Sequence, residues 1–166
     1  DFDSAPLAAS VRHHLKTNEV DAAAALIFSE AKPDVLSCNM LMNHYSVEGD
    51  VVKASELLDY MLNRGIPPTE ETYLSICNVM AFHGQVTLVE GMLELVQRDR
   101  IELNIYFYRA LLEACSSSRP PAVGAAERAF QKAVREGVRA HGLRAALSRA
   151  VGDRRAQELI RWAQTL

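Results

Sequence analysis

Residues 33–69 read PDVLSCNMLMNHYSVEGDVVKASELLDYMLNRGIPPT, a stretch with two successive runs in which apolar residues recur every three or four positions. That spacing puts the apolar side chains on one face of an α-helix, so the stretch predicts helices over residues 35–47 and 51–64. Gly49 stands between the two runs, where the first helix ends and the chain turns. Asp34 precedes the first run, where its carboxylate caps free backbone amides. The segment therefore predicts a helical hairpin.

The same pattern returns after 35 residues along the chain. Leu41 aligns with Ile76 and then with Leu111, and the third copy keeps the pattern with two extra residues in a loop over residues 116–121. A repeated unit of two helices with this period is typical of solenoid proteins. The other helices that the spacing predicts cover residues 5–16, 19–31, 70–83, 86–99, 105–116, 122–136, 143–151 and 154–166.

We expect residues 1–166 to form one all-α solenoid of about five helix-turn-helix hairpins. One such hairpin cannot bury its own apolar face, so it stacks on the next. The expected divisions are a degenerate repeat over 1–34, repeats over 35–69, 70–104 and 105–141, and a short terminal helical pair over 142–166. No apolar run reaches the roughly 18 residues that a membrane span needs, so we expect no membrane-spanning segment.

The residues that carry chemistry do not form the patterns of a known enzyme class. Cys38, Cys77 and Cys115 are widely spaced, which favours reduced thiols in the core over a zinc site or a disulfide framework. His13 and His14 are adjacent and lack an HExxH partner. The sequence also lacks a glycine-rich phosphate loop and a GxSxG elbow. We therefore predict no catalysis, no metal, no cofactor and no small-molecule substrate.

The charge is divided unevenly along the chain. Residues 105–166 hold 11 basic and 5 acidic side chains, a net charge of +6, whereas residues 1–104 hold 7 basic and 16 acidic ones, a net charge of −9. The candidate basic surface consists of Arg128, Lys132, Arg135, Arg139, Arg144, Arg154 and Arg155. These side chains suit either phosphate contacts on one face or ordinary solvated helix surfaces.

Residues 33–69 closely resemble a pentatricopeptide repeat. The marks are the Pro-Asp lead-in, Asn39 at the fifth position, the central Gly-Asp, the Ala-x-Glu-Leu-Leu run and the Arg-Gly-Ile-x-Pro ending. Residues 70–104 and 105–139 resemble further copies. The resemblance implies a right-handed α-solenoid whose first helices line a concave surface. It also implies work inside mitochondria or plastids and, for many members, binding of single-stranded RNA at about one base per repeat.

In this family a base is read by the fifth residue of a unit and the last residue before the next unit. The corresponding pairs in this sequence are Asn39 with Thr69, Leu74 with Asn104, and Arg109 with a last position near Ala140 or His141. Leu74 cannot hydrogen-bond a base edge, and Thr69 and Asn104 also suit the role of helix caps. No structural role for Asn39 is evident, so it is either an inherited family residue or a working RNA contact.

We expect a non-catalytic scaffold or adapter that docks in a larger organellar assembly, such as a ribosome, an RNA-processing particle or a membrane energy complex. Its partners are then protein subunits of that complex. The alternative is an organellar factor that binds a short single-stranded RNA element, with the aromatic residues over 106–108 and Arg109 as a stacking platform. The location expected in either case is the mitochondrion or the plastid, with any targeting peptide upstream of Asp1.

Overall fold

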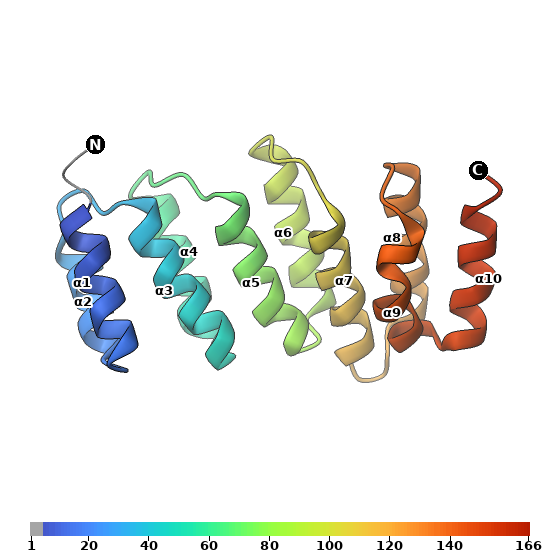
Figure 1. The fold of residues 1–166 in the computed structure, drawn as a ribbon, viewed down its shortest axis with the longest axis horizontal. Coiled ribbons are helices and arrows are strands. Elements are labelled where there is room, and N and C mark those ends of the chain that lie inside the picture. Colours follow the sequence, from blue (N-terminus) through green and yellow to red (C-terminus); the bar gives the residue numbers. More distant parts are fainter. Residues whose placement is uncertain (1–4) are drawn as a thin grey trace. The chain divides into compact units, whose positions relative to one another are not determined.

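The computed structural model describes residues 5–166, which form ten α-helices and no β-strand in that range (Figure 1). In chain order they are α1 (Ala5–Lys16), α2 (Val20–Ser29), α3 (Val35–Glu48), α4 (Val51–Asn63), α5 (Glu70–Phe82), α6 (Val86–Arg98), α7 (Ile105–Ser117), α8 (Val123–Arg135), α9 (Ala140–Val151) and α10 (Asp153–Ala163). Every helix predicted from the spacing is present. The first four residues of the expected first repeat lie outside the described part, and α9 begins earlier than predicted, at Ala140.

The chain divides into two compact units, of which the first ends at Val79 and the second begins at Met80, inside α5. In the first unit α1 packs against α2 and α3, and α3 packs against α2 and α4. In the second unit α7 packs against α6, α8 and α9, while α10 packs against α9 and α8. Each unit is thus built from helical hairpins that bury their apolar faces on one another.

Short polar side chains begin several of these helices. The Asp34 carboxylate accepts a hydrogen bond from the Ser37 amide at 2.8 Å, which caps α3. Asp50 does the same for the Lys53 amide at 3.0 Å, and it caps α4. Because the first amides of a helix have no partner inside it, each cap stabilises its helix by about 1 kcal/mol. The tight turns that these caps fix bring the two helices of a hairpin together.

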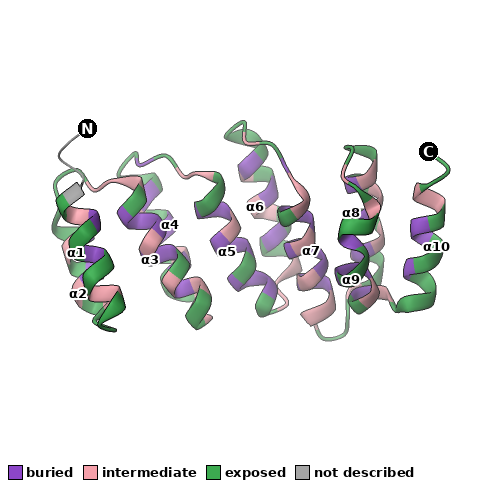
Figure 2. Ribbon diagram, in the orientation of Figure 1, coloured by how far each residue is buried: buried purple, intermediate pink, exposed green. Residues whose placement is uncertain are grey.

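The core of each unit consists of the helix faces that are turned toward neighbouring helices (Figure 2). The aligned residues Leu41, Ile76 and Leu111 are all buried. Because the same positions are buried in successive copies, the spacing that predicts the helices also predicts which of their faces are apolar.

Gly84 marks a close approach between two segments of the second unit. Its φ of +67° lies in the left-handed region, where side chains other than glycine are strained. A Cβ atom at this position would stand 2.7 Å from the carbonyl carbon and oxygen of Ser117. The turn after α5 therefore fits against the end of α7 only when residue 84 has no side chain.

Candidate nucleic-acid interface

Asn39 lies on α3 with its side-chain amide turned toward the start of α5. It is 4% exposed. Its Nδ2 donates to Thr69 Oγ1 at 3.0 Å and to Glu71 Oε2 at 3.4 Å. Its Oδ1 accepts from Thr72 Oγ1 at 2.5 Å. Both ends of the amide are therefore occupied by partners within the protein.

These partners supply the structural role for Asn39 that is not evident in the sequence. A buried amide without partners is destabilising by about 1–3 kcal/mol, and the neighbouring hairpin provides those partners here. The residue that sequence reasoning misses is Thr72, which is buried and lies 33 positions further along the chain. The Thr72 hydroxyl donates to Asn39 and accepts a hydrogen bond from the Thr69 amide at 3.0 Å.

Thr69 and Asn104 both act as helix caps, as the sequence predicts. The Thr72 amide lies 3.5 Å from Thr69 Oγ1, and the Thr69 amide donates back to Thr72, so the two threonines cap the start of α5 reciprocally. Asn104 Oδ1 accepts from the Tyr106 amide at 3.0 Å and caps α7. Leu74, the fifth residue of the second copy, is half-buried.

Arg109 lies on α7 beside the one exposed aromatic of the 106–108 run. Its guanidinium carbon lies 5.6 Å from the centre of the Tyr106 ring, and its Nη2 donates to the Gly142 carbonyl on α9 at 3.3 Å. Tyr106 is 56% exposed, whereas Phe107 and Tyr108 are buried. The predicted stacking platform is therefore reduced to Tyr106 with Arg109 at its face.

Tyr108 has a core role instead. Its hydroxyl donates to the Glu136 carboxylate at the end of α8. Burial of the ring raises the pKa of the Tyr108 hydroxyl, and the bond to Glu136 raises it further. The hydroxyl therefore stays protonated and joins α7 to the end of α8.

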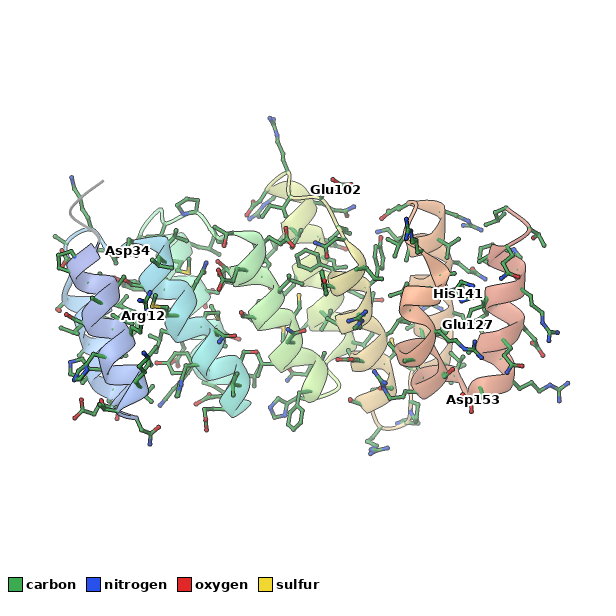
Figure 3. All side chains as sticks on the ribbon, in the orientation of Figure 1. Arg12, Asp34, Glu102, Glu127, His141 and Asp153 are labelled. Carbon is green, nitrogen blue, oxygen red and sulfur yellow. The ribbon has the colours of Figure 1, made fainter. Side chains whose placement is uncertain are left out.

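The residues of the candidate basic surface are all exposed, and three of the seven have acidic partners. Arg155 on α10 donates to both carboxylate oxygens of Glu127 on α8, at 2.6 and 2.9 Å, and to Glu158 at 3.0 Å. Figure 3 shows Glu127 in the space between α8 and α10. The pKa values of both glutamates are lowered, chiefly by these bonds to Arg155.

Three other residues of this basic surface also have partners, two through ion pairs and one through an aromatic ring. Arg154 lies 3.5 Å from Glu158, and Lys132 lies 4.0 Å from Glu136. The Arg135 guanidinium stands 6.0 Å from the centre of the Trp162 ring. Among residues 5–166, the members of the set with no ion pair or ring contact are Arg128, Arg139 and Arg144.

The remaining sequence-predicted groups also have defined surroundings. All three cysteines are free and buried, and burial raises the pKa of Cys38 and Cys115 to about 11 and that of Cys77 to about 12. His14 Nδ1 lies 2.6 Å from Glu19 Oε2. The described helices include none that is long and apolar enough to cross a membrane. Nor does the described chain bring three or more His, Cys, Asp or Glu side chains together as metal ligands.

Comparison with known proteins finds similarity to pentatricopeptide repeats. The PPR (pentatricopeptide) repeat family matches residues 33–81. Two pentatricopeptide repeat-containing proteins of Arabidopsis thaliana are 28% identical, over 103 and 112 residues. These matches cover 62% and 66% of this chain but only 22% and 23% of the relatives' own length.

The solved structures show the same fold. The PPR domain of Arabidopsis thaliana protein-only RNase P 1, solved in complex with tRNA, is similar with a TM-score of 0.78 and 15% identity, over 98% of this chain and 87% of that one. The pentatricopeptide repeat protein PPR10, solved in complex with an 18-nt psaJ RNA element, has a TM-score of 0.77 and 20% identity, over 98% of this chain and 25% of that one. The predicted all-α solenoid fold is confirmed.

Proposed function

Because residues 33–81 match the pentatricopeptide repeat family and the fold is similar to that of its solved members, we propose that this chain is a non-catalytic helical-repeat scaffold that docks protein subunits within a larger organellar assembly. The proposal includes a location in the mitochondrion or plastid. It also includes the same candidate assemblies that the sequence suggests, namely a ribosome, an RNA-processing particle or a membrane energy complex.

The observation that carries the proposal is that the hydrogen-bonding groups of the Asn39–Thr69 pair are already bonded within the protein. The Asn39 amide bonds to Thr69, Glu71 and Thr72 within the protein. A base that used the same amide would have to break these bonds, and the hydrogen bonds gained would only replace those lost. Since one correct base contact is worth about 1–3 kcal/mol, the exchange leaves little net discrimination at this repeat.

The ion pairs of the second unit support the same proposal. Counterion release gives affinity for nucleic acid only where lysine or arginine replaces cations on the phosphates. The Arg155 guanidinium is already held by Glu127 and Glu158, and Arg154 and Lys132 lie beside Glu158 and Glu136. The charge available to a phosphate backbone is therefore smaller than the count of basic residues suggests.

A second candidate function is recognition of a short single-stranded RNA. It is favoured by the exposed Tyr106 ring with the Arg109 guanidinium at its face, because aromatic and guanidinium planes stack on bases. The solved relatives in complex with RNA and tRNA are consistent with it.

The experiment that separates the two is recovery of the tagged protein from purified organelles with and without ribonuclease, with both protein and RNA measured in the eluate. The scaffold function predicts the same stoichiometric proteins after ribonuclease. RNA recognition predicts that the eluate is reduced to protected RNA fragments, and this outcome would overturn the scaffold proposal.

A matched variant sharpens the result. Tyr106→Ala combined with Arg109→Ala removes the stacking pair and leaves the buried neighbours Phe107 and Tyr108 in place. The scaffold function predicts an unchanged set of recovered proteins. The RNA function predicts loss of the protected fragments, together with a wild-type affinity that falls steeply between about 50 and 200 mM salt.

A further inference from the structure

A groove of about 250 Å³ runs between α6 and α8 in the second unit. α6 and α8 form its two sides, and α7, which packs against both, contributes Tyr108 and Leu111. The floor of the groove is apolar and includes Leu93, Leu111 and Ala129. No hydrogen bond or ion pair crosses the groove from α6 to α8 in the described chain.

The groove exists because small and charged side chains stand where the first unit has large apolar ones. The seventh residue of α4 is Leu57, and the seventh of α8 is Ala129. The tenth residue of α4 is Tyr60, and the tenth of α8 is Lys132. The helices have the same length, so the difference lies in the side chains and not in the register.

The partner helices differ in the same way. The ninth residue of α2 is Phe28, whose ring packs edge-on against Tyr60 with the ring centres 4.8 Å apart. The ninth residue of α6 is Glu94. The eighth residues, Ile27 and Leu93, are both buried, which supports this alignment. The first unit therefore has, between α2 and α4, an aromatic pair that the second unit lacks between α6 and α8.

The walls of the groove carry opposite charges. Glu90 and Glu94 lie one helical turn apart on α6, and Arg128 and Lys132 lie one turn apart on α8. All four are exposed. Lys132 also lies 4.0 Å from Glu136, but neither glutamate of α6 has an ion pair in the described chain.

We propose that the groove between α6 and α8 docks a segment of a partner protein that inserts one large apolar side chain, with a basic side chain beside α6 and an acidic one beside α8. The first unit shows which side chains fit such a junction, since an aromatic pair fills it there. The proposal rests on the scaffold function and identifies the surface and the chemistry of its partner.

The charges select a protein segment over a nucleic acid. A phosphate backbone that approached Arg128 and Lys132 would also meet the carboxylates of Glu90 and Glu94 across the groove. A peptide can satisfy both walls at once, and a peptide with the reversed order of charges would place like charges together on each side. The order of charge across the groove is therefore the specificity determinant.

The test uses a displayed library of random peptides, selected on the tagged full chain. We expect the selected peptides to share one large apolar residue between a basic and an acidic residue. Their affinity should fall at least about tenfold on the variant E94F/K132Y, which rebuilds the Phe28–Tyr60 pair in the second unit. Arg161→Glu, an exposed charge reversal on α10 outside the groove, should leave the affinity unchanged.

A second variant keeps the test decisive if E94F/K132Y does not fold. The charge exchange E90K/E94K/R128E/K132E should reject the same peptides and select peptides with the opposite order of charges. Peptides without this pattern, or equal binding to both groove variants and the wild type, would overturn the proposal.

The same variants separate this inference from the function on which it rests. Ribonuclease-resistant proteins that return equally with the wild type and with E94F/K132Y would overturn the groove as the docking site and leave the scaffold function standing. Loss of those proteins with E94F/K132Y, but not with Arg161→Glu, supports both. If the wild type recovers no ribonuclease-resistant proteins, the scaffold function and the docking role that rests on it both fall.

Discussion

The junction between α2 and α4 and the junction between α6 and α8 occupy the same place in two pairs of hairpins, but only the first has an aromatic pair between its two helices. Phe28 packs on Tyr60 in the first junction, and the Tyr60 hydroxyl donates to the Ile27 carbonyl at 3.2 Å. Arg64 adds bonds to the carbonyls of Glu30 and Ala31 at 3.1 and 2.9 Å.

The second junction has charged walls and an open floor, and the second unit is joined elsewhere by ion pairs. Arg155 joins α10 to α8 through Glu127, and Arg149 joins α9 to α7 through Glu113 at 3.0 Å. The repeat period alone therefore does not decide whether the side chains of neighbouring hairpins pack against one another. Side chains at a few positions of the second helix decide whether a junction is closed or remains open to a partner.

The largest effect is expected from exchanging the seventh residues of α4 and α8. Leu57→Ala empties a fully buried position in the first unit and should lower the free energy of unfolding by about 2–5 kcal/mol. Ala129→Leu adds volume beside the groove, where there is space, and should change stability by less than about 1 kcal/mol. Urea unfolding of both variants measures the difference. Equal destabilisation would mean that the second junction is as tightly filled as the first.

The next comparison concerns the fifth residue of the repeat in each unit. Asn39→Ala leaves the buried Thr72 hydroxyl without its acceptor and should lower the free energy of unfolding by about 1–3 kcal/mol. Arg109→Ala removes a partly exposed side chain and should change it by about 0.5 kcal/mol or less. Thermal melts of the two variants, with RNA titrations alongside, would contradict this account if Asn39→Ala kept full stability and lost RNA affinity.

A smaller effect is expected from the ninth residues of α2 and α6. Phe28→Ala removes a ring that is 47% exposed and its edge-to-face contact with Tyr60, so it should be destabilising by about 1 kcal/mol. Glu94→Ala removes an exposed carboxylate with no bond across the groove and should have almost no effect. A shift of the unfolding midpoint for Glu94→Ala as large as that for Phe28→Ala would show that α6 and α8 are joined after all.

The parts of the fold that the sequence predicts are those with local causes. The apolar spacing, the caps at Asp34 and Asn104 and the turn at Gly49 act within a few residues, so ten helices follow from reading along the chain. The start of α9 at Ala140 is an exception, because the 35-residue period with its two extra residues extends the third repeat to residue 141.

The surroundings of the candidate site depend on contacts between hairpins, which spacing does not reveal. Asn39 and Thr72 are 33 residues apart and meet only when α3 packs beside the start of α5. The groove between α6 and α8 cannot be predicted from the sequence for a related reason. Phe28 aligns with Glu94 only when the two helices are compared from their first residues, and the upstream loop has a different length from the others.

The smallest effect tests whether the two units depend on pH differently. Glu127 has a lowered pKa because Arg155 bonds to its carboxylate, so its ionised form is favoured in the folded protein. Such a group contributes stability above its unfolded pKa of about 4.3, and this contribution is lost as the pH falls through the lower folded value. Glu127→Gln should therefore be slightly less stable than the wild type at pH 7 and equal to it in acid.

Tyr60→Phe is the matched variant in the first unit, because it removes a bond between a neutral hydroxyl and the Ile27 carbonyl. Its loss of about 1 kcal/mol should be the same at pH 7 and in acid, since a backbone carbonyl and a hydroxyl form the bond without a carboxylate. Urea unfolding of both variants at several pH values measures the contrast. A Glu127→Gln difference that persists in acid would mean that the side chain contributes by packing, and the role of the ion pair between Glu127 and Arg155 in joining α8 to α10 would then fail.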